Sequence, residues 1–109
     1  MADEDYVEAV LSIVEQVPEG SVTTYGLIAE VLHDALGRGG PRTVAAVMVR
    51  RGSEVPWWRV VRADGSLPQD LADNARPEYL GEGTPLRQTG EVDLRKAVWV
   101  PPDIHSQEP

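Results

Sequence analysis

Six arginines and two adjacent tryptophans fall between residues 33 and 62, where only Asp34 and Glu54 oppose the positive charge. Arginine binds phosphate oxygens through a planar fork and stacks on aromatic rings, which lysine does less well. The middle of the chain therefore suits phosphate and aromatic recognition, although ordinary surface charge and aromatic core packing would use the same residue types. These residues are Trp57 and Trp58 with Arg38, Arg42, Arg50, Arg51, Arg59 and Arg62.

The other reactive side chains exclude several kinds of chemistry. The 109 residues contain no cysteine, so disulfides, cysteine-bound zinc and thiol catalysis are excluded. The two histidines, His33 and His105, are isolated, and no Ser-His-Asp set is visible. We expect no catalytic residue, no metal site and no cofactor, and an enzyme is the least favoured class.

Charge is distributed unevenly along the chain, whose net charge is −8. Residues 1–32 contain seven acids and no Lys or Arg, and residues 63–109 contain nine acids and four bases. The net charge alone disfavours nucleic acid as a partner, whereas the basic middle favours it. No hydrophobic run approaches the roughly 18 residues that span a membrane, and the acidic N-terminus is unlike a signal peptide. We expect a cytoplasmic protein with no membrane partner.

One domain is the natural count for this length, so residues 1–109 are expected to form a single unit with a frayed tail at 101–109. Hydrophobic spacing, caps and prolines predict three helices in its first half. Thr24 is a suitable N-cap for the second helix, and Pro41 takes a favoured first position in the third. A glycine-rich connector joins these two as a helix-turn-helix, in which the second helix reads DNA. The predicted helices cover residues 5–17, 25–36 and 41–51.

The segment around the tryptophans is predicted to be extended. Pro56 lets the chain enter it from an edge or a turn, and residues 59–61 form a β run before the Asp-Gly turn at 64–65. Since neighbouring side chains on a strand point to opposite faces, at most one tryptophan fits a single core. The other must face a cleft, a partner or water, and either Trp57 or Trp58 could do so.

The rest of the chain is predicted to contain little regular structure. Residues 66–90 are expected to be mostly irregular, with one short helical turn at 77–80, because their three prolines forbid a long helix. A last short element covers 92–99, with Asp93 as its N-cap and Trp99 buried. The expected fold is mostly α with a short β element.

Three motifs, in this order, resemble the DNA-binding domain of the O6-alkylguanine-DNA alkyltransferases. In that family the third motif is Pro-Cys-His-Arg-Val, and its cysteine takes the alkyl group; here Trp57 stands at the cysteine's position. That replacement marks the alkyltransferase-like proteins, which lack transfer activity, bind alkylated guanine and flag it for nucleotide excision repair. The resemblance covers residues 5–65, and residues 82–83 and the ending through Trp99 also resemble the family. The motifs are Thr23-Thr24-Tyr25-Gly26-Leu27-Ile28-Ala29, Pro41-Arg42-Thr43-Val44-Ala45 and Val55-Pro56-Trp57-Trp58-Arg59-Val60-Val61.

The resemblance implies a role for each matching residue. Tyr25 would drive rotation of the nucleotide, Arg42 would enter the duplex and fill the vacated stack, and Trp57 would form the floor of the alkyl pocket. The helix-turn-helix would lie in the minor groove. The implied DNA-binding residues are Thr24, Tyr25, Arg42, Thr43, Ala45 and Ala46, and the implied alkylguanine pocket consists of Tyr25, Trp57, Trp58, Arg59 and Val60.

The chain also departs from the transferase pattern. Trp58 replaces the histidine of a Cys-His-Glu relay, for which only Glu82 could supply the acid. The loop after Gly65 lacks the family's Gly-Gly-Tyr, and either Asp70 or Arg76 would close the pocket.

The resemblance implies a winged-helix-like domain of the alkyltransferase C-terminal type, acting as a monomer. Its partners would be double-stranded DNA containing O6-alkylguanine and nucleotide excision repair proteins. Two other classes fit the sequence less well. A winged-helix transcriptional regulator would need base-reading side chains, and the first turn of the third predicted helix offers a single arginine. A protein-interaction module would use the tryptophan pair as a hot spot.

Overall fold

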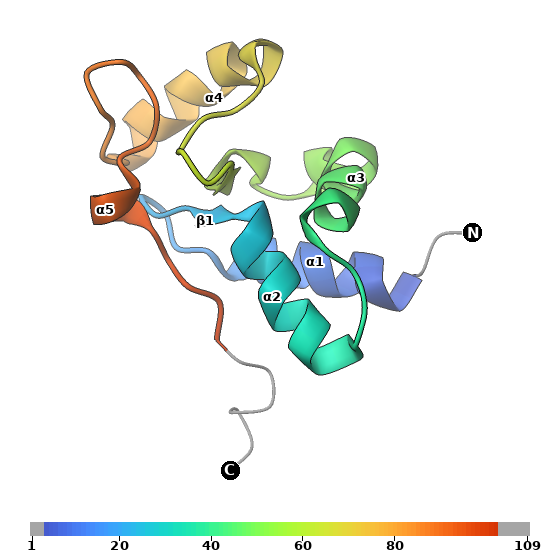
Figure 1. Ribbon diagram of the computed structural model, residues 1–109. Helices are drawn as coiled ribbons and strands as arrows, with labels where there is room; N and C mark the ends of the chain where they lie inside the picture. Colours follow the sequence, from blue (N-terminus) through green and yellow to red (C-terminus); the bar gives the residue numbers. More distant parts are fainter. Residues whose placement is uncertain (1–3, 103–109) are drawn as a thin grey trace.

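The computed structural model describes residues 4–102, which form a mostly helical fold with one small sheet (Figure 1). This confirms the predicted fold class. No helix among these residues is long and apolar enough to cross a membrane. The elements in chain order are α1 (Glu4–Gln16), β1 (Thr23–Thr24), α2 (Tyr25–Leu36), α3 (Pro41–Arg51), the 3₁₀ turns η1 (Gly52–Glu54) and η2 (Trp57–Arg59), β2 (Val60–Val61), α4 (Gln69–Glu82) and α5 (Leu94–Ala97).

Helices α1, α2 and α3 pack around the main hydrophobic core, and all three lie within one residue of their predicted ranges. Each helix contributes the apolar face that the spacing of its hydrophobic residues predicts. Val10 and Val14 of α1, Ile28 of α2 and Val44 of α3 have no exposed surface. Val55 and Val60, which flank the tryptophans in the sequence, complete this core, whereas Trp57 and Trp58 pack against a separate cluster of buried residues.

Local signals set the ends of α2 and α3 as predicted. The Thr24 side chain accepts a hydrogen bond from the Leu27 backbone N–H at 3.1 Å, so it caps α2. Gly37 ends α2 in the left-handed conformation, with φ of 74°, which glycine adopts without steric cost. Pro41 then begins α3, after a four-residue link, residues 37–40, that forms the turn of the helix-turn-helix.

A two-stranded parallel sheet ties the start of α2 to the segment after the tryptophans. Thr23 pairs with Val60 and Thr24 pairs with Val61. Val22, one residue earlier, forms a further bridge to Val98. A second, smaller core covers the other side of this sheet and includes Val22, Val61, Ala75, Tyr79, Val92 and Ala97.

The prediction for residues 66–90 is wrong, because α4 is a continuous helix of 14 residues with Pro77 inside it. Proline removes the backbone N–H that would bond to the carbonyl four residues earlier, at Asp73. Both residues lie on the exposed face of α4, where water can satisfy that carbonyl. The opposite face buries Ala75 and Tyr79, and this burial holds the helix together.

The tryptophan segment also differs from the prediction. Trp57 and Trp58 lie on the 3₁₀ turn η2, and only Val60 and Val61 of the expected β run are extended. The turn forms because the Arg59 N–H donates to the Pro56 carbonyl at 3.1 Å. Near the C-terminus, the prediction of α5 and of its Asp93 cap is confirmed.

Trp99 is partly buried and packs against the main core, so its predicted burial is only partial. Pro101, predicted as the start of the tail, is buried, whereas Pro102 is exposed. The remainder of the predicted tail, residues 103–109, lies outside the described part of the chain.

Candidate nucleic-acid interface

A cavity of about 740 Å³ opens between the start of α2, one side of α3, the tryptophan turn and the segment that leads into α4. Its walls are mainly apolar. The aromatic side chains in them are Trp57 and Tyr25, and the charged ones are Arg42, Arg62 and Asp70. The lining residues are Tyr25, Pro41, Arg42, Ala45, Met48, Val49, Gly52, Ser53, Trp57, Arg62, Leu67, Pro68, Asp70 and Leu71.

Tyr25 is placed at this cavity because it is the first residue of α2, directly after the Thr24 cap. Burial raises the pKa of its phenol, and the positive charge of Arg62 offsets part of that rise. The phenol is therefore neutral at physiological pH, and it can approach an anionic phosphate without charge repulsion.

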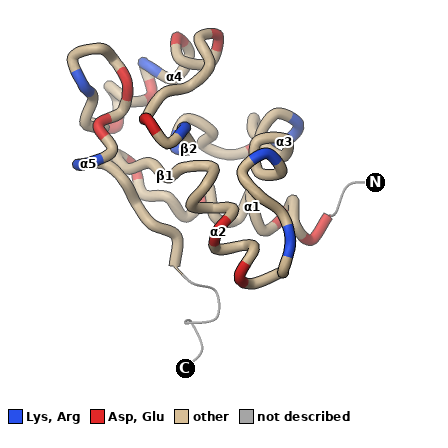
Figure 2. Tube along the Cα trace, viewed as in Figure 1, with Lys and Arg blue, Asp and Glu red and all other residues tan. Residues whose placement is uncertain are grey.

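The exposed face of α3 is divided between two grooves. Arg42, Ala45 and Val49 line the large cavity. Thr43, Ala46 and Arg50 line a second groove, on the side of α3 that faces α1. Val49, on the cavity side, is 86% exposed, so the presented face combines small and apolar side chains with Arg42 at one groove and Arg50 at the other. Figure 2 shows positive residues on α3 and on the link before it, and negative residues on α1 and along α4.

The two tryptophans have different environments. Trp57 lines the cavity, whereas Trp58 does not. Their rings meet edge to face, with centroids 5.7 Å apart and planes at 85°. The Trp58 indole N–H donates to a carboxylate oxygen of Glu82 at 3.1 Å, and the Tyr79 hydroxyl donates to the Trp58 carbonyl at 2.6 Å. Trp58 thus supports the turn on which Trp57 is mounted.

Glu82 is the centre of a buried polar network behind the cavity. Arg59 donates to it through Nε at 3.1 Å and Nη2 at 2.6 Å, and the Gly20 backbone N–H donates at 3.3 Å. The Arg59 and Glu82 side chains are only 13% and 10% exposed. Burial alone would raise the pKa of Glu82, but the hydrogen bonds from Arg59, Gly20 and Trp58 outweigh it, and the pKa falls below its ordinary value.

The structure brings together part of the residue set predicted from the sequence. Tyr25, Arg42, Ala45 and Trp57 converge on one cavity. The predicted pocket members Trp58 and Arg59 instead hold Glu82, and the Val60 side chain lies in the main core with no exposed surface. Of the predicted DNA-binding residues, Thr24 is a buried helix cap, and Thr43 and Ala46 line the second groove.

Asp70 lines the cavity, whereas Arg76, the alternative closing residue, lies at a separate hollow beside Gly90. Sequence reasoning missed Arg62, which directly follows β2 and lines the cavity together with Tyr25. Its position next to the short β run, at the end of the arginine-rich stretch, was the signal that could have found it. Within residues 4–102 there is no group of His, Cys, Asp and Glu side chains that could hold a metal ion.

The helix pair, its basic edges and the cavity at its base define a helix-turn-helix DNA-binding domain of the alkyltransferase type. Residues 5–81 match the family described as "6-O-methylguanine DNA methyltransferase, DNA binding domain". The chain belongs to this family and, within it, to the alkyltransferase-like proteins.

Relatives and solved structures agree with this assignment. The "DNA base-flipping protein" of Vibrio parahaemolyticus is 30% identical over 103 residues, which cover 90% of this chain and 99% of the relative. The protein of the same description from Escherichia coli is 34% identical, with 89% and 76% covered. S. pombe Atl1, solved with damaged DNA containing O6-carboxymethylguanine, matches with a TM-score of 0.73 at 24% identity, covering 93% of this chain and 100% of that one. A second S. pombe ATL complex with DNA gives the same TM-score at 25% identity.

Proposed function

We propose that this protein recognises O6-alkylguanine in duplex DNA without repairing it, by turning the modified nucleotide out of the helix and holding it against Trp57. The observation that carries this proposal is the cavity of about 740 Å³, which joins Tyr25, Arg42 and Trp57 at the base of α3. A mainly apolar cavity of this size, lined by an indole, suits a planar base with an alkyl substituent. The naming of its relatives as base-flipping proteins supports the same mode of binding.

The energetics of extrusion favour a damaged base. Turning a nucleotide out of a duplex costs a few kcal/mol, roughly, and costs less when its pairing is already weakened. An alkyl group on O6 removes the normal pairing pattern of guanine, so the lesion lowers that cost. Stacking a base on an aromatic side chain returns about 1–3 kcal/mol, which Trp57 can provide. The difference between damaged and undamaged DNA therefore arises mainly from the duplex.

Two side chains of the cavity would assist the exchange. Arg42 is exposed in the first turn of α3, where it can enter the duplex and occupy the space left by the nucleotide. Tyr25 lines the same cavity from the start of α2, where a neutral phenol can press against the backbone phosphate and turn the nucleotide. The narrow minor groove, about 6 Å wide, would meet the face of α3 that carries Ala45 and Ala46.

Alkyl transfer is outside the chemistry of this chain. No residue is a cysteine, and the indole of Trp57 offers no nucleophile in its place. Trp58 occupies the position of the relay histidine, but an indole N–H only donates and cannot accept a proton. The protein would act in the cytoplasm as a monomer that marks the lesion for nucleotide excision repair proteins.

A titration of matched duplexes tests the proposal. Binding of a duplex with one O6-methylguanine should quench tryptophan fluorescence, and it should be tighter than binding of the same duplex with guanine. Arg42→Ala and Tyr25→Ala should both weaken lesion binding. Arg42 is exposed, so its removal should leave the melting temperature unchanged, whereas Tyr25 packs partly against the main core, so Tyr25→Ala should lower the melting temperature without unfolding the protein in the assay. Arg95→Ala, an exposed arginine on α5, is the control and should bind like the wild type.

Equal affinity of the wild type for the two duplexes would refute damage recognition. Tight binding to a defined undamaged sequence would favour a transcriptional regulator, and no DNA binding at low salt would favour a protein-interaction module.

A further inference from the structure

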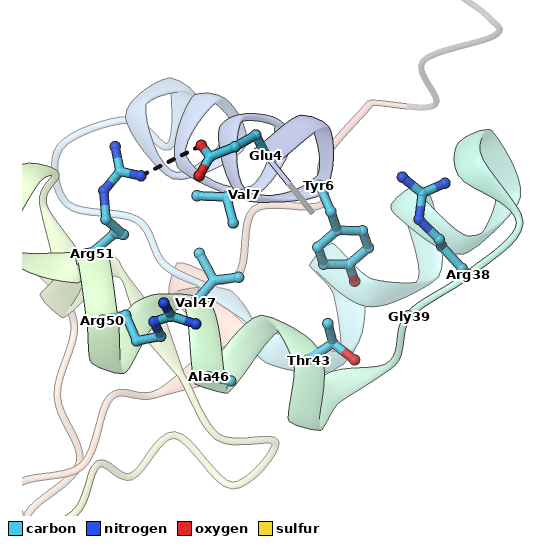
Figure 3. Close-up of a pocket in the computed structure, with 10 residues that line it drawn as sticks. All are labelled: Glu4, Tyr6, Val7, Arg38, Gly39, Thr43, Ala46, Val47, Arg50 and Arg51. Carbon is cyan, nitrogen blue, oxygen red and sulfur yellow. Dashed lines mark ion pairs between the residues drawn. The ribbon is translucent and has the colours of Figure 1, made fainter. Parts of the chain in front are cut away.

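A second groove lies on the opposite side of α3 from the cavity, between α3, α1 and the link that precedes α3 (Figure 3). It measures about 330 Å³, and its surface is apolar at the floor and charged at the rim. Among residues 4–102, its lining contains three arginines and one acid, Glu4. The lining residues are Glu4, Tyr6, Val7, Arg38, Gly39, Thr43, Ala46, Val47, Arg50 and Arg51.

The three arginines are not equivalent. Arg51 contacts Glu4 at 3.8 Å and Glu8 at 3.7 Å, and it also forms a two-point pair with Glu54, so its charge is neutralised within the protein. Arg50 is exposed and forms no ion pair with any acid of residues 4–102. Its charge is therefore available to an outside anion.

Thr43 and the link before α3 complete the rim. The Thr43 hydroxyl accepts a hydrogen bond from the Gly40 N–H at 3.3 Å, which leaves its own O–H as a donor. Gly39, at φ of 89°, lies so close to Tyr6 that a Cβ would sit 2.3 Å from the phenol oxygen. This contact fixes the link against α1 and holds Arg38 at the edge of the groove. In Figure 3, Arg38 and Arg50 lie at opposite ends of the groove, and Tyr6 and Thr43 are seen between them.

The position of this groove identifies its occupant. A helix that enters the minor groove has one strand of the duplex along each side. The cavity side of α3 faces the strand that gives up its nucleotide, so the side with Thr43 and Arg50 faces the complementary strand. We propose that this second groove binds backbone phosphates of the strand opposite the lesion, through Arg50 and the Thr43 hydroxyl. The inference rests on the proposed function, because it takes α3 to lie in the minor groove.

Such contacts would hold the duplex without reading the base. Contacts to phosphates set register and affinity and carry no sequence information. They would keep the complementary strand in place while the other strand is distorted, and they should contribute equally to damaged and undamaged DNA. They would also explain how a chain with a net charge of −8 keeps DNA affinity, since the positive charge is concentrated on both sides of one helix.

Salt dependence of binding provides the first test. Removing one arginine–phosphate interaction should reduce the slope of log K against log salt by about 0.9. Arg50→Gln should lower that slope by about one and weaken binding about two- to fivefold, equally for duplexes with O6-methylguanine and with guanine. Arg95→Gln removes the same charge far along the chain and should change the slope little. Thermal melting checks that each variant is folded.

Replacing single phosphates of the duplex with uncharged methylphosphonates shows which strand the second groove contacts. Methylphosphonate groups placed on the complementary strand near the lesion should weaken wild-type binding more than Arg50→Gln binding, whereas the same groups on the lesion strand should weaken both proteins equally. An unchanged salt slope in Arg50→Gln, or coupling of Arg50 to the lesion strand, overturns this inference.

The two proposals fail separately. If the wild type prefers the lesion duplex and Arg50→Gln binds with the same affinity and salt slope, only the second groove is misassigned. If Arg50→Gln lowers the slope while the wild type binds both duplexes equally, lesion recognition fails and the phosphate contact stands.

Discussion

Replacing Glu82 with glutamine should destabilise the protein strongly, because it leaves Arg59 without its buried counter-charge. Removing one partner of a buried ion pair costs roughly 3–5 kcal/mol. Glutamine keeps one acceptor oxygen, and Arg59 Nη1 still donates to the Val17 carbonyl at 3.0 Å. We therefore expect the free energy of unfolding to fall by about 2–4 kcal/mol, with a value of about 2–3 kcal/mol most consistent with these remaining contacts. This corresponds to a fall in Tm of roughly 10–20 °C for a domain of this size.

The effect of Glu82→Gln should also depend on pH. The folded-state pKa of Glu82 lies below its ordinary value, so the carboxylate contributes stability above the pKa of the unfolded chain. That contribution is lost as the pH falls through the lower, folded-state pKa. The difference in unfolding free energy between the wild type and Glu82→Gln should therefore be largest near neutral pH and should shrink below about pH 4.

Urea unfolding followed by tryptophan fluorescence at neutral and acidic pH measures both effects. Glu54→Gln is the matched control, because it also breaks a carboxylate–arginine pair, but one that is exposed to solvent. Its unfolding midpoint should stay close to that of the wild type. If Glu82→Gln unfolds at the wild-type midpoint at neutral pH, the buried network does not support the tryptophan turn.

Three further substitutions test the fold and the site. Pro77→Ala should raise the free energy of unfolding by about 1–2 kcal/mol. A proline inside a helix destabilises it by roughly 3 kcal/mol, but it also restricts the unfolded chain, which offsets part of that cost; a lower Tm would contradict a continuous α4. Gly65→Ala should lose roughly 1–3 kcal/mol in chemical denaturation, because φ is 86° and a Cβ would lie 2.3 Å from the Val92 carbonyl oxygen; wild-type stability would contradict this turn. Trp57→Cys should transfer no labelled methyl group from O6-methylguanine DNA, because Trp58 cannot take the thiol proton; labelled protein would refute this.

The helix-turn-helix could be predicted from the sequence because its determinants are local. Thr24 caps α2 through a residue three positions away, Gly37 ends that helix, and Pro41 begins the next. Each signal acts within one turn of helix and needs no tertiary contact. The failure at α4 has the opposite cause, because Pro77 is tolerated only on a face exposed to water, and that depends on what Ala75 and Tyr79 pack against.

The site could be predicted in part for the same reason. Motif positions pointed to Tyr25, Arg42 and Trp57, which do line one cavity. Arg62 reaches that cavity because β2 pairs with β1, and the segment 67–71 reaches it because the chain leading into α4 packs beside the cavity. No local sequence pattern shows either arrangement. The environment of Trp58 depends on Glu82, 24 residues further along, so composition alone left its role open.

The short parallel pairing of Thr23 with Val60 and of Thr24 with Val61 has a mechanical consequence. Tyr25 directly follows β1 in the sequence, and Trp57 and Arg62 lie before and after β2. The sheet thus joins two parts of the cavity wall, the start of α2 and the tryptophan segment, by backbone hydrogen bonds, and separating these parts would mean breaking those bonds. These two parts of the wall therefore keep their spacing when a nucleotide enters, and on this side of the cavity the deformation on complex formation falls on the double helix.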